Sequence, residues 1–138
     1  MGLEQYNLEL GLWFKNYSIE TYDRDYSLVV DLTYRLSVKH HFQCRKWISK
    51  LKKYIEDNGY EIDGFMVSEY NGERNLHNHL LVVGNFSNSV GKKLIYNFWN
   101  KIGSCLIRDY DDNQGYSIYI SKFLNQGMNN EWELISNL

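Results

Sequence analysis

Two histidines separated by one residue, His77 and His79, are the residues of this chain best suited to bind a metal ion. They lie in an aliphatic run, Leu76 to Val83, that is typical of a strand and ends at Gly84. Side chains alternate between faces along a strand, so both imidazoles point the same way. Such a pair can hold a divalent metal, although histidines also occur as packing or surface residues.

Glu69 precedes this strand and is the candidate for a third ligand. Asn71-Gly72 predicts a tight turn between two neighbouring strands. A two-residue turn would pair Glu69 with Arg74 and place the carboxylate on the face opposite both histidines. A three-residue or bulged connection pairs Glu69 with Asn75 instead and brings the three candidate ligands to one face. The metal hypothesis therefore requires an odd-numbered connection.

Tyr119 and Lys122 form a second candidate group near the end of the chain. They are three residues apart, so they share one face of the helix predicted from Tyr116 to Gln126. A tyrosine can attack phosphorus when a metal polarises the phosphate and a cation stabilises the developing charge. This pair is weak evidence by itself because the chain has 12 tyrosines, most of which must serve packing or the surface.

Composition indicates one domain. The chain has 138 residues, a hydrophobic fraction of 43% and a net charge of −2, so any nucleic-acid site must be a local basic patch. Two distant cysteines exclude a disulfide framework or a zinc finger. No apolar run is long enough to cross a membrane. We therefore expect a soluble cytoplasmic protein that works without a membrane or a small-molecule cofactor.

The elements that would position these residues follow from periodicity and capping signals. Residues 1–25 are difficult to assign, with Leu8 to Phe14 suggesting a short strand, and residues 128–138 suggest a short helical turn or a frayed end. The predicted elements between these ends are a strand at Ser27–Tyr34, a helix at Phe42–Asp57 stopped by Asn58-Gly59, strands around 65–69 and 76–83, a helix at Ser87–Lys101 capped by Asn88 or Ser89, a strand at Ser104–Tyr110 and the helix at Tyr116–Gln126.

The order strand, helix, strand, strand, helix, strand is the split β-α-β arrangement. It predicts an α+β sandwich of the ferredoxin or RRM type, with a central antiparallel sheet and helices on one face. The helix predicted at the C-terminal end carries the candidate catalytic pair, Tyr119 and Lys122. The first strand and the histidine strand are its two central strands.

Three segments, taken in order, resemble the three motifs of rolling-circle replication initiators, the Rep branch of the HUH endonucleases. They are Val30-Asp31-Leu32-Thr33-Tyr34, the segment from Glu69 to His79, and Tyr119-Ile120-Ser121-Lys122. The resemblance spans about residues 28 to 125 and implies one Rep-type domain over 1–138, with a core at about 26–126. It implies metal-dependent nicking and joining of single-stranded DNA, in replication initiation, through a covalent 5′-phosphotyrosine intermediate.

The resemblance also implies a role for each matching residue. His77, His79 and Glu69 would bind Mg²⁺ or Mn²⁺, Tyr119 would be the nucleophile and Lys122 would assist it.

Two positions depart from the motif pattern. Asn78 stands where an apolar residue is usual, which leaves open how the far side of the strand packs. Phe123 stands where some relatives, especially phage initiators, carry a second tyrosine, which favours a single-tyrosine enzyme.

The expected partner is single-stranded DNA or an origin hairpin, in a prokaryotic cell or a virus-infected host. Because the chain lacks a glycine-rich phosphate loop, host replication proteins or a separate helicase would open the duplex. A homodimer is compatible with the sequence. The candidate DNA-binding residues are Arg45, Lys46, Lys50, Arg74 and Tyr116.

Two other functions remain open. A non-catalytic single-strand-binding module would present aromatic residues on the sheet and grip phosphates with the basic helix, and it would need neither metal nor Tyr119. A single-tyrosine transposase shares the fold and the chemistry and acts as a dimer on hairpin ends. The basic helix can also be an ordinary solvated face.

Overall fold

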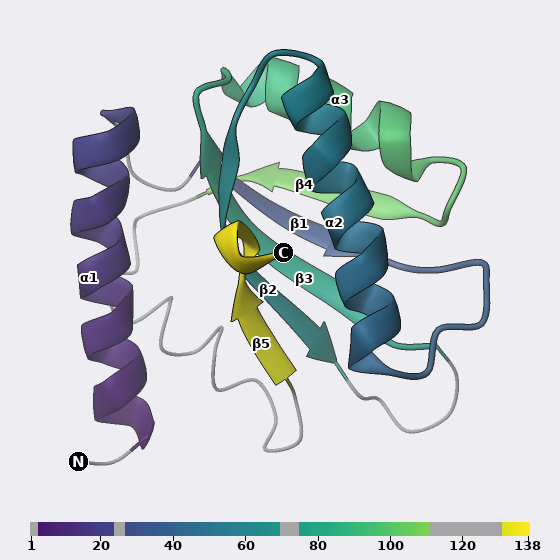
Figure 1. Cartoon of the computed structure of the whole chain (residues 1–138), viewed down its shortest axis with the longest axis horizontal. Helices are drawn as coiled ribbons and strands as arrows, with labels where there is room; N and C mark the ends of the chain where they lie inside the picture. Colours follow the sequence, from purple (N-terminus) through teal and green to yellow (C-terminus); the bar gives the residue numbers. More distant parts are fainter. Residues whose placement is uncertain (1–2, 24–26, 70–74, 111–130) are drawn as a thin grey trace.

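The computed structural model describes residues 3–23, 27–69, 75–110 and 131–138, which form an α+β sandwich (Figure 1). Its elements are α1 (Leu3–Tyr22), β1 (Leu28–Leu32), α2 (His41–Asp57), β2 (Ile62–Glu69), β3 (His77–Gly84), α3 (Asn88–Trp99), β4 (Cys105–Asp109), β5 (Glu131–Leu134) and the 3-10 turn η2 (Ile135–Asn137). The strands form one antiparallel sheet in the order β4-β1-β3-β2-β5. As predicted, β1 and the histidine strand β3 are interior strands.

The helix α2 confirms the sequence prediction at both ends. It starts after His40, whose backbone N–H donates to the side-chain oxygen of Gln43 over 3.1 Å. It ends at Asp57 with Asn58 as its C-cap, and Gly59 follows with a φ of 89°, a backbone conformation that favours glycine. The helix buries residues at spacings of three and four, namely Cys44, Ile48, Leu51 and Ile55.

The helix α3 also forms where the sequence predicts it, with a different cap. Ser87, rather than Asn88 or Ser89, caps α3, because its hydroxyl accepts the backbone N–H of Val90 over 3.2 Å.

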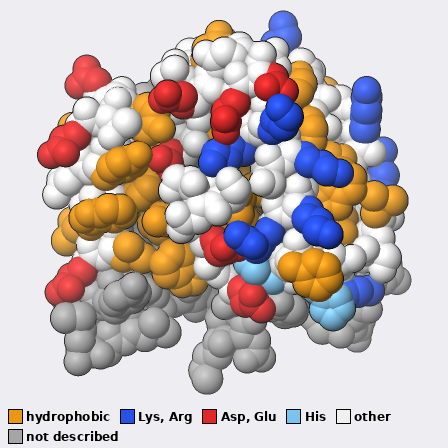
Figure 2. Space-filling view, in the orientation of Figure 1, with side chains coloured by type: hydrophobic (Ala, Val, Ile, Leu, Met, Phe, Trp, Pro, Cys, Tyr) orange, Lys and Arg blue, Asp and Glu red, His pale blue; other side chains and the backbone are white. Residues whose placement is uncertain are grey.

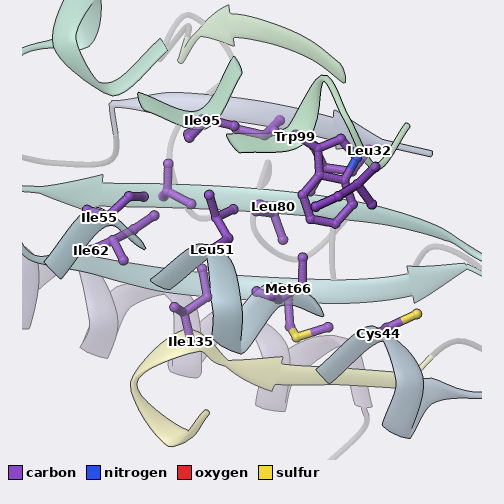
Figure 3. Packing of buried hydrophobic residues seen from close by; sticks show 14 of the residues in the cluster. Leu32, Cys44, Leu51, Ile55, Ile62, Met66, Leu80, Ile95, Trp99 and Ile135 are labelled. Atoms are coloured by element: carbon purple, nitrogen blue, oxygen red, sulfur yellow. The ribbon is translucent and has the colours of Figure 1, made fainter. Parts of the chain in front are cut away.

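Alternate residues of the sheet enter two separate cores. Leu80 and Val82 of β3 face α2 and α3, where they join a cluster that includes Leu51, Met66 and Trp99 (Figure 3). The odd-numbered side chains of β2 and β3 point to the opposite face of the sheet. Those that pack there with Phe14 of α1 include Phe65, Val67, Leu81 and Val83. Figure 1 shows α1 and α2 on opposite sides of the sheet. Both faces of β3 are therefore buried along most of its length, which accounts for its continuous apolar run.

The predicted strand at Leu8 to Phe14 is wrong, because this segment lies inside helix α1. Phe14 packs on Phe65 with ring centroids 5.0 Å apart, and the Tyr17 hydroxyl donates to Asp63 over 3.1 Å. Apolar residues occur around several sides of α1, so the helical period is weak in the sequence. None of the described helices is long and apolar enough to span a membrane.

The C-terminal segment contains a strand that the sequence analysis missed. Glu131–Leu134 pairs antiparallel with the free edge of β2 and makes the sheet five-stranded. The expected short helical turn is present only as η2, where Ile135 is buried. A four-residue strand with two glutamates carries little local signal, and its pairing with β2 is a long-range interaction.

Candidate active site

The register between β2 and β3 places the three predicted metal ligands on one face of the sheet. Glu69 lies directly opposite His77, and Val67 lies opposite His79. The expected pairing of Glu69 with Asn75 is wrong by two residues along the strand. A shift of two preserves the face, so the odd-numbered connection across residues 70–76 still brings the carboxylate to the histidine side.

His79 lies between two carboxylates that come from the strands on either side of β3. Its Nε2 is 2.6 Å from Oε2 of Glu69, a diagonal neighbour on β2. Its Nδ1 is 2.6 Å from Oδ1 of Asp31, which lies directly opposite it on β1. The other oxygen of Asp31 accepts from Arg108 over 3.2 Å. The ring is thus held at both nitrogens.

Asp31 is a site residue that sequence reasoning missed. It lies within the first motif, to which the sequence assigns no role at this position. The signal was a carboxylate in the middle of a buried apolar strand, between Val30 and Leu32.

These contacts change the proton affinities of both partners. The hydrogen bond to His79 lowers the pKa of Asp31, against a smaller opposing effect of burial. The hydrogen bond to Asp31 raises the pKa of His79; burial opposes this shift, and Glu69 reinforces it. The protonated imidazole is therefore favoured when the two carboxylates are its only partners. A metal ion at Nε2 would have to displace that proton.

The donors at this place fit a hard divalent metal. His77 is partly exposed on the same face, beside Glu69, while His79 and Glu69 already bring a nitrogen and an oxygen together. Two imidazoles and a carboxylate leave coordination positions open for phosphate and water. Among the described residues, however, no group of three or more His, Cys, Asp or Glu side chains is arranged to hold a metal ion.

Asn78, between the two histidines, points to the opposite face and is fully buried. The Tyr34 hydroxyl donates to its side-chain oxygen, and its amide nitrogen donates to the Val67 carbonyl over 3.1 Å and to the Ser68 hydroxyl over 3.0 Å. The polar residue that replaces the usual apolar one thus has hydrogen-bond partners for both of its polar atoms. Asn78 is therefore accommodated on the far side of β3 by hydrogen bonds rather than by apolar packing.

The hydrogen-bond network continues from Ser68 toward the edge of the sheet. Ser68 is 2.7 Å from Nδ1 of His41, whose Nε2 is 2.7 Å from Glu133 on β5. Arg45 of α2 forms an ion pair with the same carboxylate at 2.6 Å. Arg45, a predicted DNA-binding residue, therefore helps to connect α2 to the edge strand.

The structure separates the basic helix from the histidines. Arg45, Lys46 and Lys50 are on α2, which packs against the sheet face opposite His77 and His79. The remaining predicted site residues lie outside the described residues: Arg74, Tyr116, Tyr119 and Lys122, together with the Asn71-Gly72 turn.

The fold and this site define an α+β protein with a histidine and two carboxylates joined across three neighbouring strands. The sequence profile of the family described as replication-associated protein ORF2/G2P matches residues 27–127, which is most of the chain. The chain belongs to this family, and its membership connects it with DNA replication. Neither a curated protein nor a solved structure matches the chain significantly.

Proposed function

We propose that this protein initiates replication as an HUH-type endonuclease that nicks and rejoins single-stranded DNA. The observation that carries the proposal is the convergence of His79 Nε2 and Glu69 on the face that also presents His77. Family membership supplies the biological setting, since the matched region includes all three candidate ligands. These residues lie on interior strands, which hold catalytic groups more rigidly than loops do.

The proposed metal ligands are His77, His79 and Glu69. A bound Mg²⁺ or Mn²⁺ would supply Lewis-acid polarisation of a non-bridging phosphate oxygen. Asp31 would accept the Nδ1–H of His79 and so keep Nε2 free as the coordinating nitrogen. A carboxylate behind a ligating histidine is a common device for fixing its tautomer and orientation.

Tyr119 is the proposed nucleophile. Its oxygen bonds to phosphorus while the bond from phosphorus to the deoxyribose 3′-oxygen breaks, which leaves the 5′-phosphate on the tyrosine and a free 3′ end. Lys122, three residues further along the chain, would stabilise the negative charge on the phenolate or on the leaving oxygen. Rejoining is the reverse attack by a 3′-hydroxyl on the phosphotyrosine.

The test is the formation of a covalent adduct. The protein is incubated with single-stranded DNA and Mn²⁺ or Mg²⁺, and the products are separated on a denaturing gel. We expect a shifted band that Tyr119→Phe abolishes and Tyr116→Phe retains, because only Tyr119 has a lysine three residues after it. Peptide mapping of the DNA-linked fragment identifies the residue.

Two results would contradict this proposal. An adduct on Tyr116 would overturn the choice of nucleophile. DNA binding without an adduct under either metal would favour a non-catalytic single-strand-binding module.

A further inference from the structure

The helix α2 concentrates positive charge in a protein whose net charge is −2. Residues 41–55 contain five lysines and arginines and no Asp or Glu. Figure 2 shows Lys and Arg side chains gathered over α2. These cations are Arg45, Lys46, Lys50, Lys52 and Lys53.

Three of the five cations have partners that explain their positions. Arg45 is paired with Glu133 at 2.6 Å, and Lys53 with Asp57 at 3.4 Å. Lys52 donates to backbone carbonyls of the C-terminal residues, including that of Leu138 at 3.2 Å. These three contacts are internal to the fold.

Lys46 and Lys50 differ, because neither forms an ion pair with any residue in the described part of the chain. Both are exposed, and each lies over an aromatic ring: Lys46 is 5.8 Å from the centroid of Phe42, and Lys50 is 4.6 Å from that of Trp47. The helix dipole does not explain them, since it favours cations only in the last turn. Their charges are available to an external anion.

An exposed aromatic ring lies beside these lysines. Phe42 is 56% exposed, and its ring stacks on His40 with centroids 5.5 Å apart and planes 7° from parallel. Flat rings next to cations are the features with which proteins bind single strands, because bases stack on the rings while cations contact phosphates.

A pocket connects these side chains into one surface. Its volume is about 480 Å³. It is lined by Phe42, Arg45, Lys46, Ser49, Lys50 and Leu138.

We propose that this α2 surface, defined by the pocket-lining residues, binds single-stranded DNA outside the cleavage site. Lys46 and Lys50 contact phosphates, and a base stacks on Phe42. The inference rests on the proposed function only in taking single-stranded DNA as the partner. Because α2 and the histidines lie on opposite faces of the sheet, this surface holds a part of the strand distant from the nick.

The test is fluorescence anisotropy with a labelled thymidine oligonucleotide, in metal-free buffer so that no cleavage occurs. The variant is Lys46→Glu/Lys50→Glu. The control is Lys93→Glu/Lys101→Glu, two exposed lysines outside the pocket lining with the same change of net charge. We expect the α2 variant to lose at least about tenfold in affinity and about 1.4 in the slope of log K against log salt, since each single-strand phosphate contact contributes roughly 0.7.

Phe42→Ala separates stacking from charge. It should weaken binding by at least about fivefold without changing the salt slope. Circular dichroism verifies the fold of every variant. Equal losses in the α2 variant and the control, or no measurable binding by the wild type, would overturn the inference.

The adduct assay of the proposed function is run separately on the wild type. No adduct together with α2-dependent binding would refute cleavage and leave the interface standing. An adduct together with unchanged binding by Lys46→Glu/Lys50→Glu would support cleavage and refute the α2 interface.

Discussion

Asn78 and His79 are neighbours on β3, yet they lie in opposite environments because they face opposite sides of the sheet. Asn78 is fully buried, and its partners are neutral groups, Tyr34, Ser68 and the Val67 carbonyl. The side chain of His79 is 21% exposed and contacts two carboxylates, Asp31 and Glu69.

This difference in environment makes Asn78 a structural residue and leaves His79 available for chemistry. The bonds of Asn78 are neutral and inaccessible to solvent, so they specify how β3 packs under α2. His79 can gain or lose a proton, and water can reach it, so a metal or substrate can compete for its contacts. We therefore expect substitutions on the His79 face of the sheet to affect the chemistry most, and substitutions on the Asn78 face to affect stability most.

His77→Ala should give the largest effect on activity. It removes one proposed ligand, so we expect adduct formation to fall on the order of a hundredfold or more. The free energy of unfolding should change by less than about 0.5 kcal/mol, because the side chain is partly exposed. Adduct yield on a gel and urea unfolding measure the two effects. Asn97→Ala, at an exposed position on α3, is the control, and adduct yields equal to it would remove His77 from the site.

Asn78→Ala should have the largest effect on stability. It leaves the Tyr34 hydroxyl and the Val67 carbonyl without this partner and creates a small cavity, so we expect a loss of about 2–4 kcal/mol in urea unfolding. Asn97→Ala, on the exposed side of α3, should change stability by less than about 0.5 kcal/mol. A similar small loss at both positions would mean that the buried network contributes little.

Asp31→Asn tests the carboxylate behind His79. Without the charged acceptor at Nδ1, Mn²⁺ affinity should weaken by about 10–100-fold, as is usual when such a partner is removed. Titration calorimetry measures the change. Asp109→Asn is the matched control, because this carboxylate pairs with Lys92 and lies outside the site. Unchanged affinity in Asp31→Asn would show that the contact with His79 has no role in metal binding.

The pH dependence of stability should be the smallest of these effects. In the metal-free protein the raised pKa of His79 adds stability that is complete below about pH 6.5 and is lost as pH rises through the folded pKa. The lowered pKa of Asp31 adds stability that is lost as pH falls below about 3.8. The pair therefore stabilises the metal-free fold most between these values.

Metal binding should show the opposite trend, because it requires neutral His79. We expect Mn²⁺ affinity to increase as pH rises above about 6.5, and Asp31→Asn to move this increase to lower pH. Affinity that stays constant down to pH about 5 would argue against His79 as a ligand.

Local pattern was sufficient for much of the fold and for part of the site. The spacing of Trp47, Leu51, Tyr54 and Ile55 predicts α2, and the Asn58-Gly59 stop predicts its end. Side chains alternate between faces along β3, so His77 and His79 lie on one face independently of the tertiary contacts of the strand. These features depend only on neighbours in sequence, which is why periodicity reveals them.

Tertiary structure decided which residues meet those histidines. The length of the connection between β2 and β3 selects the face of Glu69, and the pairing of β1 with β3 brings Asp31 to His79. The partners of Asn78, the position of β5 and the docking of α1 also depend on contacts between distant segments. Strand register and helix docking are determined by the combined packing of the whole core, so no local stretch of sequence specifies them alone.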